Sequence, residues 1–351
     1  MRTGGDDLAQ ALALLGVRPV WDGISRRVVD FEVIPVRTLG RPRVDVTLRV
    51  SGFFRDAFPN LIELFHQASA LVSTLNESSD DNPIAHTVQK DTQTWTRQGL
   101  DPQLALEQAQ YRVFGSKPGA YGAGLQGLIE SQNWKDDGDL AQAYLNWSSY
   151  AYTGKGNGKA APSAFQARIT GLQVVLQNQD NREHDLLDSD DYYQFQGGMV
   201  AAVKSLSATQ PTTYFGDNSN TSNPKVRSLS EELSKVYRSR VINPKWIAGV
   251  MRHGYKGAFE MSATVDFLFG YSATTGEVPD HMYEGIAQAY LLDQTVQQFL
   301  QKSNVWAARD MADRLLEAHQ RKLWKTADAQ TITKLQAISL DAEGAIEQTL
   351  I

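Results

Sequence analysis

The spacing of apolar residues along the chain changes near residue 229. Beyond this point apolar residues recur every three or four positions almost without a break, which is the period of helices packed on one side. The pattern predicts helices over residues 229–241, 244–251, 254–271, 281–291, 294–302 and 305–323. We therefore expect an all-helical C-terminal region, residues 229–351.

The first 75 residues mix the two periods. A helix is predicted over 8–15, with Asp6 or Asp7 as its N-cap and Gly16 at its end. Two stretches rich in β-branched residues, 31–36 and 44–50, predict strands, and a helix is predicted over about 58–75. This order is typical of part of an α/β layer, so residues 1–75 are interpreted as a partial layer cut from something larger.

The middle region, residues 76–228, also reads as mixed α/β. Its polar start, 76–100, predicts a loop with a break at Asn82–Pro83, and residues 153–159 resemble a linker. Helices are predicted over 102–113, 139–150, 162–170 and 198–206, and strands over 172–176 and 212–215. The expected fold class is therefore mixed α/β with an all-helical C-terminal part, in three regions: 1–75, 76–228 and 229–351.

A dense acidic segment follows the predicted strand at 172–176. Residues 177–193 hold six carboxylates around His184: Asp180, Glu183, Asp185, Asp188, Asp190 and Asp191. Like charges at this density repel one another, so they indicate a counter-ion, a proton-transfer task or a charged partner, unless the segment is simply a solvated loop.

His184 and Asp188 are four residues apart and would share one face if the segment were locally helical. Such a pair could bind a divalent cation, or act as a base oriented by a carboxylate. A local salt bridge that merely satisfies the histidine is the alternative.

A basic stretch follows at 225–256. Its cations outnumber Glu231 and Glu232, and they are Lys225, Arg227, Lys235, Arg238, Arg240, Lys245, Arg252 and Lys256. The alternatives are a solvated helix face, a surface for an acidic partner, or docking onto the acidic segment itself.

Composition excludes several classes of function. The chain has no cysteine, which rules out disulfides, thiolate metal sites and cysteine nucleophiles, and its net charge of −6 argues against a generally basic nucleic-acid binder. No apolar run is long enough for a membrane helix, and acids at positions 6 and 7 do not fit a signal peptide. A cytoplasmic protein without nucleic-acid or membrane partners is therefore expected.

Two glycine-containing patterns bear on nucleotide binding. No P-loop sequence is present, so the chain is not expected to hydrolyse ATP. Residues 122–127 match G-x-G-x-x-G, but the preceding Ser116–Gly119 is not strand-like, as a dinucleotide site requires. A close backbone turn, lying against a flat ligand, is the preferred interpretation.

Taken together, several stretches resemble the large subunits of aerobic cobaltochelatases (CobN type), within the wider family that includes magnesium chelatases. The resemblance covers essentially the whole chain and is carried by residues 2–7, 39–46, 51–56, 114–122, 177–199 and 243–246. The magnesium branch shares the second, third and last of these motifs, whereas the acidic segment resembles the cobalt branch.

The resemblance implies the C-terminal part of a larger, multidomain subunit that binds a tetrapyrrole and a metal. It implies insertion of Co²⁺ into hydrogenobyrinic acid a,c-diamide during cobalamin (vitamin B12) biosynthesis, with ATP hydrolysed by two AAA+-type partner subunits. The rest of the large subunit would be a further partner, so this piece alone is expected to be inactive. The alternatives are a magnesium-chelatase-like subunit or a non-catalytic tetrapyrrole-binding scaffold.

Roles for individual residues follow from this resemblance as hypotheses. His184 and Asp188 are expected to be catalytic, with His184 taking a pyrrole proton, and His184, Asp188 and Asp190 are expected to guide the metal. The tetrapyrrole is expected to contact Tyr121, Gly122, Asn181, Arg182 and Ser189. Carboxylates suit such a task because their oxygen atoms exchange readily and pass the ion on.

Overall fold

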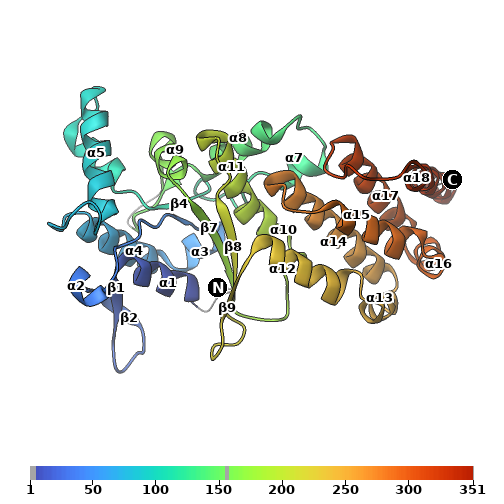
Figure 1. Cartoon of the computed structure of the whole chain (residues 1–351), viewed down its shortest axis with the longest axis horizontal. Helices are drawn as coiled ribbons and strands as arrows, with labels where there is room; N and C mark the ends of the chain where they lie inside the picture. The colour runs from blue at the N-terminus through green and yellow to red at the C-terminus, as the bar shows by residue number, and fades with distance from the viewer. Residues whose placement is uncertain (1–4, 155–157, 351) are drawn as a thin grey trace.

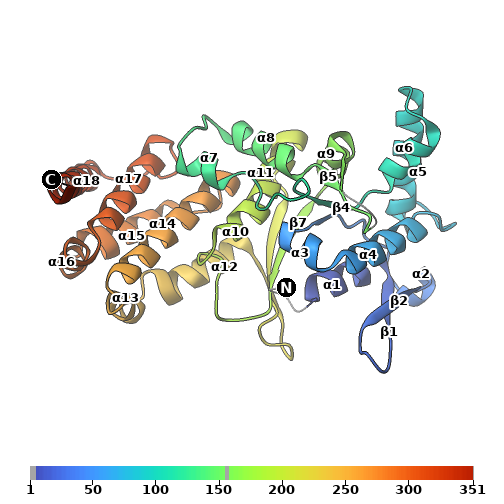
Figure 2. The same cartoon turned by 180° about the vertical axis from the view of Figure 1, so that it is seen from behind.

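A computed structural model describes residues 5–154 and 158–350 of the chain. Parts of the predicted linker at 153–159 and of the motif at 2–7 lie outside the described residues. The molecule is elongated, with helix α5 near one end and helix α18 at the other (Figure 1). The strands of the middle region lie between these ends, as the view from behind also shows (Figure 2).

The N-terminal helix α1 (Asp6–Leu15) is confirmed and ends at Gly16, as predicted. Its N-cap is Gly5, so the prediction of Asp6 or Asp7 as the cap was wrong by one position. Both acids lie instead in the first turn, where the positive end of the helix dipole stabilises them. The next elements are the antiparallel pair β1 (Val17–Trp21) and β2 (Val28–Val33), then α2 (Val36–Leu39).

The strand predicted over 44–50 is mostly irregular in the structure. Only β3 (Leu48–Arg49) is a strand, because its parallel partner β4 (Val113–Gly115) pairs with it at two positions. Helices α3 (Gly52–Ala57) and α4 (Pro59–Val72) follow. The inner face of α4 is buried beside α1, in a hydrophobic cluster that contains Phe65.

The prediction of a loop over residues 76–100 was wrong. Helix α5 (Pro83–Arg97) occupies it, and the expected break at Asn82 is its start. The Asn82 side chain accepts a hydrogen bond from the backbone N–H of Ala85, and Pro83 occupies the first helical turn. Because only Ile84 and Val88 are buried, the helix is polar on most of its surface and has little apolar periodicity.

Two further sheets within the described residues lie mainly in the middle region. One has the order β3-β4-β5-β6 and is completed by β5 (Tyr150–Ala151) and β6 (Lys159–Ala160). In the other, β7 (Val174–Gln179) pairs in parallel with β8 (Thr212–Asp217), and β8 pairs antiparallel with β9 (Lys225–Ser228). The helices around them are α6 (Pro102–Ala109), α7 (Gln126–Glu130), α8 (Asp137–Ser148), α9 (Pro162–Thr170) and α11 (Gly198–Ser207).

From residue 229 to 350 the described chain forms helices and short connections, which confirms the mixed α/β fold with a helical C-terminal part. Helix α18 had not been predicted, because the expected helices stopped at residue 323. The elements are α12 (Leu229–Val236), η2 (Tyr237–Val241), α13 (Pro244–Met251), α14 (Tyr255–Thr275), α15 (Asp280–Ile286), η3 (Ala287–Leu292), α16 (Gln294–Ser303), α17 (Val305–Gln320) and α18 (Ala329–Leu350).

The larger hydrophobic cluster runs from Tyr111 to Leu335 and crosses residue 228. Helix α14 lies at its centre, with Met261, Val265 and Leu268 fully buried. The division into three domains stays a prediction. No helix within the described residues has both the length and the apolar character needed to cross a membrane.

Candidate functional site

The acidic segment connects β7 to the short helix α10 (Asp190–Tyr192) as an irregular loop. Residues 180–189 are not helical, so His184 and Asp188 do not share a helix face. The loop is anchored by Leu186 and Leu187, which are both fully buried. Burial of two leucines contributes a few kcal/mol, roughly 1.5–3 for each, which holds the polar residues around them in place.

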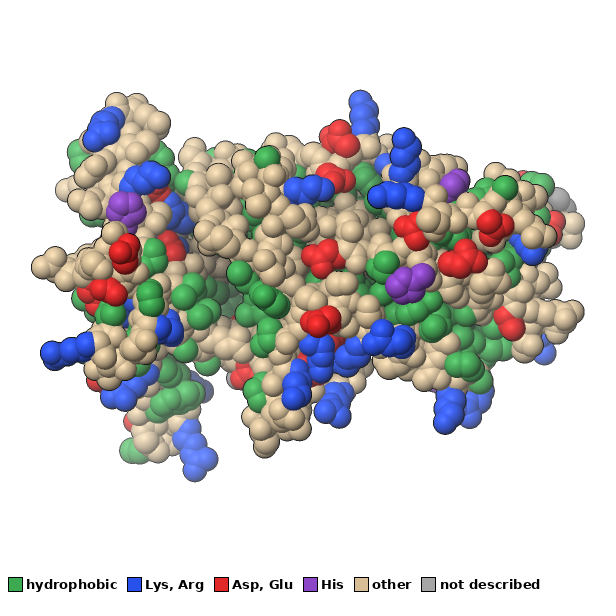
Figure 3. Space-filling view, in the orientation of Figure 1, with side chains coloured by type: hydrophobic (Ala, Val, Ile, Leu, Met, Phe, Trp, Pro, Cys, Tyr) green, Lys and Arg blue, Asp and Glu red, His purple; other side chains and the backbone are tan. Residues whose placement is uncertain are grey.

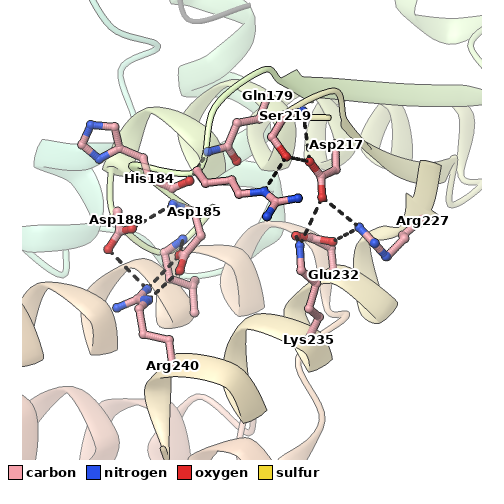
Figure 4. Close-up of polar contacts among 12 residues, drawn as sticks. Gln179, His184, Asp185, Asp188, Asp217, Ser219, Arg227, Glu232, Lys235 and Arg240 are labelled. Atoms are coloured by element: carbon pink, nitrogen blue, oxygen red, sulfur yellow. Dashed lines mark hydrogen bonds and ion pairs between the residues drawn. The ribbon is translucent and has the colours of Figure 1, made fainter. Parts of the chain in front are cut away.

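Arg240, from the π-helical segment η2, is the main partner of this loop (Figure 4). Its Nε and Nη2 atoms donate to the two carboxylate oxygens of Asp185 at 2.6 and 2.8 Å, and Nη2 lies 3.4 Å from Asp188. The guanidinium also packs over the ring of Trp246, 5.2 Å from its centroid. For Arg240, the structure confirms that the basic stretch docks onto the acidic segment.

Two other cations of the basic stretch neutralise different carboxylates. Arg227 and Lys235 lie 2.9 and 2.7 Å from Glu232, and each lies 3.4 Å from Asp217 (Figure 4). Lys and Arg side chains are visibly gathered over α12 in the lower middle of the molecule (Figure 3). The basic stretch therefore serves partly as internal counter-charge, and its other members stay candidates for partner contacts.

Arg182 reaches the same ionic cluster through a serine. Its Nε donates to Ser219 Oγ at 3.2 Å, and that hydroxyl donates to Asp217 Oδ1 at 2.5 Å. Asp217 ends β8 directly opposite Gln179, the last residue of β7. The beginning of the acidic loop is thus tied to the sheet and, through Asp217, to α12, although Arg182, Glu183 and His184 are exposed.

Asp188 differs in its electrostatics from an ordinary surface carboxylate. Burial, with the neighbouring Asp185 charge as a second cause, raises its pKa above the usual range of an aspartate, although Arg240 acts in the opposite direction. The Asp188 side chain therefore takes up a proton more readily than a solvated aspartate does. A raised carboxyl pKa of this kind is a feature of groups that exchange protons with substrates.

The three predicted metal-guiding residues lie along this loop in different settings. The exposed imidazole of His184 points away from Arg240, while its backbone carbonyl accepts a hydrogen bond from Gln179 (Figure 4). Asp190 accepts a hydrogen bond from Gln194 Nε2 at 2.6 Å. Across residues 5–154 and 158–350, no group of three or more His, Asp or Glu side chains is arranged to hold a metal ion. The metal roles stay predictions.

The glycine-rich loop forms the close turn that the sequence predicts. Gly119, Gly122 and Gly124 have φ values of +79°, +84° and +83°, in the left-handed region that favours glycine. A Cβ atom on Gly124 would collide with the ring of Trp147. More than half of Tyr121 is exposed, and its hydroxyl donates to Asp56 at 2.8 Å. That a flat ligand lies against this loop stays a prediction.

Gln194 connects the glycine-rich loop with the acidic segment. Its Oε1 accepts from the backbone N–H of Gln126 at 3.4 Å, and its Nε2 donates to Asp190. Gln194 lies in η1 (Tyr193–Gly197), a π-helical turn between α10 and α11. π-helical turns are frequent at functional sites because they redirect side chains within a helix. The two predicted halves of the site therefore lie next to each other.

Arg49 supports this junction and had not been predicted. It donates to the carbonyls of Gly122 and Val50 at 2.8 and 3.0 Å and to Ser148 Oγ at 3.1 Å, and it packs 4.3 Å from the centre of the Phe195 ring. Burial lowers its pKa to about 10, so it remains a cation at neutral pH. The sequence could have indicated a role for Arg49, because this charged residue lies inside a stretch of strand-forming residues.

Asn181 and Ser189 have local structural contacts. The Asn181 amide donates to Asp180 at 3.2 Å and accepts from the backbone N–H of Glu183 at 3.2 Å. Ser189 is the N-cap of α10, where its hydroxyl accepts from the backbone N–H of Asp191. Both residues shape the loop, and their contacts with a tetrapyrrole stay predictions.

Comparisons with known proteins bear on the identity of this arrangement. The chain is 56% identical to the aerobic cobaltochelatase subunit CobN of Pseudomonas aeruginosa, over 98% of this chain and 27% of that protein. It is 32% identical to a magnesium-chelatase subunit of Rhodobacter capsulatus, over 99% of this chain and 28% of that protein. The catalytic subunit of cobaltochelatase from Mycobacterium tuberculosis has the same fold, with a TM-score of 0.92, 48% identity, and coverage of 97% of this chain and 28% of that one.

These matches extend along nearly the whole chain, yet the chain spans only 27% of the length of the Pseudomonas relative. The family model described as CobN/Magnesium Chelatase matches residues 1–331. The resemblance expected from the sequence is thus confirmed, and the chain belongs to the CobN/magnesium chelatase family.

Proposed function

We propose that this chain is the part of a cobaltochelatase large subunit that holds a tetrapyrrole while Co²⁺ is inserted, with hydrogenobyrinic acid a,c-diamide as the substrate. The greater identity to the Pseudomonas CobN protein than to the Rhodobacter magnesium-chelatase protein, 56% against 32%, favours the cobalt branch. The structural observation that carries the proposal is the junction at Gln194, because it joins the glycine-rich loop to Asp190.

The chemistry of metal insertion suits the residues around this junction. The inner N–H protons of the macrocycle must leave, and the hydrated ion must lose water. Histidine side chains are suited to general-base work, and His184 exposes its imidazole in the same loop as Asp188, a carboxyl with a raised pKa. Asp190 offers carboxylate oxygen as an exchangeable ligand for the incoming ion. The flat face of the macrocycle would then lie against Tyr121 and Gly122.

The proposal includes two AAA+-type partner subunits that hydrolyse ATP. The absence of a P-loop sequence from this chain supports that division of labour. Because the chain spans 27% of the Pseudomonas relative, we expect catalysis to require the rest of the large subunit as well. Co²⁺ is in this scheme a substrate, which the loop passes on and does not retain.

The test measures cobalt insertion by the full-length large subunit with both ATPases, followed by the absorbance change of the tetrapyrrole. We expect His184→Ala to reduce the rate roughly 100-fold, as for loss of a general base. His253→Ala, a change of another exposed histidine, which lies within the basic stretch, is the matched control and should keep the rate. Insertion at the wild-type rate by His184→Ala would reject the proton-transfer role.

Metal competition in the same assay distinguishes the other candidates. A magnesium-chelatase-like protein would insert Mg²⁺ in preference to Co²⁺, and the 32% identity to the Rhodobacter relative over 99% of the chain is the observation that supports it. A non-catalytic scaffold would bind the tetrapyrrole, seen as quenching of tryptophan fluorescence, and would insert neither metal.

A further inference from the structure

A pocket of about 430 Å³ lies outside the acidic loop, among residues of α7, α14 and α17, which are adjacent in Figures 1 and 2. Its rim carries aromatic side chains that are unusually exposed: Tyr255 is 63% exposed and Phe259 is 59% exposed, and Trp306 lies nearby. Exposed aromatic residues around a hollow are typical of surfaces that bind another molecule.

The pocket is acidic as well as aromatic. Its described lining residues include the carboxylates of Glu130, Asp266 and Asp310, and one cation, Arg314. Arg314 is shared between Asp266 at 2.7 Å and Glu317 at 2.5 Å, so it does not neutralise the lining alone.

The cations around the pocket do not balance the excess of negative charge on its lining. Arg309 lies 3.0 Å from Asp310, and Arg321 lies 2.6 Å from Glu317. With these neighbours included, four carboxylates face three guanidinium groups. Burial raises the pKa of Asp266, and the charges of Asp310 and Glu130 act in the same direction, whereas Arg314 opposes them.

Tyr193 provides an independent indication of a ligand. Its side chain is among those that line the pocket, yet the residue is only 3% exposed. Burial raises the pKa of its hydroxyl, and within the described parts of the chain no hydrogen bond reaches that group. The hydroxyl is not one of the fully buried polar atoms that lack a partner, so it opens onto the pocket, where a ligand can donate to it or accept from it.

The chemistry of the pocket selects the class of ligand. An acidic tetrapyrrole would be repelled by the carboxylates, and a metal ion finds no group of three ligands among the described residues. A guanidinium fits best, because it is planar, stacks on aromatic rings and pairs with carboxylates. The same region already holds guanidinium groups in this way: Arg309 lies 4.8 Å from the Trp306 ring centre, and Arg314 lies 4.7 Å from that of Phe269.

We propose that this pocket receives an arginine side chain from a second protein docked on the face formed by α14 and α17. The charge complementarity and the exposed aromatic rim together favour a protein segment with apolar residues on both sides of the arginine. This inference concerns a surface outside the acidic loop and does not depend on the proposed metal insertion.

The experiment uses the 351-residue chain labelled with 5-fluorotryptophan, with the Trp306 signal in ¹⁹F NMR spectra identified by Trp306→Phe. The chain is titrated with N-acetyl-arginine amide, with its uncharged analogue N-acetyl-citrulline amide, and with acetyl-Leu-Arg-Leu-amide. We expect saturable shifts of the Trp306 signal with the arginine compound, at least tenfold weaker binding of the citrulline compound, and tighter binding of the tripeptide than of the single residue.

Charge-matched variants separate the pocket from general electrostatics. The double change Glu130→Gln with Asp310→Asn should weaken binding of the arginine compound at least fivefold. Glu343→Gln with Glu347→Gln, which removes the same charge from α18, should leave binding unchanged. Tyr193→Phe should weaken binding about threefold, as for one lost hydrogen bond.

The proposal is overturned if the citrulline compound binds as well as the arginine compound, or if the α18 double variant loses as much affinity as the pocket variant. A Trp306 signal that does not move would also overturn it. Equal affinities of the tripeptide and the single residue would show that the pocket binds a free guanidine compound, which would contradict docking of a protein.

Discussion

Arg49 and Arg240 stabilise the two halves of the candidate site in different ways. Arg240 pairs with carboxylates of the acidic loop, whereas Arg49 donates to two carbonyls and a hydroxyl around the glycine-rich loop. Contacts of the first kind depend on whether the carboxylates are ionised, and those of the second kind do not. Between about pH 5 and 8 the contacts of Arg49 therefore hold the glycine-rich loop in the same way, while those of Arg240 respond to protons.

The glycine-rich loop is thus a rigid surface, whereas the contacts of the acidic loop depend on pH. A tetrapyrrole-binding surface benefits from fixed geometry, because ordering a loop on binding reduces affinity. A loop that exchanges protons and ions benefits from carboxylates that are only partly neutralised. Five substitutions test this contrast, and they are given in order of decreasing expected effect.

Gly124→Ala, in the glycine-rich loop, should have the largest effect on the free energy of unfolding. The new methyl group would collide with Trp147 in a left-handed backbone conformation, so we expect a loss of about 3–4 kcal/mol in the free energy of unfolding. Gly119→Ala is the control, because it has a similar φ and open space at the Cβ position, and it should cost only about 1 kcal/mol. Urea unfolding measures both, and equal losses would show that packing on Trp147 does not matter.

Arg240→Met should destabilise the chain by about 3 kcal/mol at pH 7, because Asp185 and Asp188 are left facing each other without their cation. The loss should shrink as the pH falls toward about 4, where carboxylates become protonated. Thermal unfolding between pH 4 and 8 checks this. A loss that is constant with pH would contradict the charge-based role of Arg240.

Arg49→Met should destabilise the chain by about 2 kcal/mol, since it removes three hydrogen bonds to neutral groups. The same series of thermal measurements should give a loss that hardly changes between about pH 5 and 8, where Arg49 is charged. If the loss varied with pH as it does for Arg240→Met, the contrast between the two arginines would be wrong.

Asp188→Asn should stabilise the chain slightly at neutral pH. The raised pKa of Asp188 means that protonation favours the folded state, so the wild-type contribution is present at low pH and is lost as the pH rises through the raised pKa. The variant is uncharged throughout, and we expect a gain of up to about 1 kcal/mol at pH 7 that disappears near pH 4. Glu183→Gln, an exposed change in the same loop, should show no such pH-dependent gain in thermal unfolding.

His184→Ala should change the free energy of unfolding least, by less than about 0.5 kcal/mol, because its side chain is exposed. Circular dichroism during urea unfolding measures this change. Together with the loss of insertion rate expected above, a small value would separate function from stability. A loss above about 2 kcal/mol would show that His184 has a structural role.

The sequence predicted most of the helical part and the two halves of the site, for physical reasons that are local. Helix α14 could be predicted because its buried face repeats at the helical period, and the glycine-rich turn because Gly122 and Gly124 have no side chain to obstruct it. Helix α5 was missed because it buries only Ile84 and Val88 and so lacks that period. Asn82 was interpreted as a break in a loop, but it is the N-cap of α5 and could have identified this helix.

The family, the helical C-terminal part and the density of charge around His184 follow from the sequence alone, since these depend on residue types and their spacing. Which charges are neutralised and which loops meet depends on how the chain is packed in three dimensions. Arg240 reaches Asp185 across 55 positions, Arg49 reaches Gly122 across 73, and Gln194 reaches Gln126 across 68. Contacts at such separations are set by the packing of helices and strands, and no local pattern encodes them.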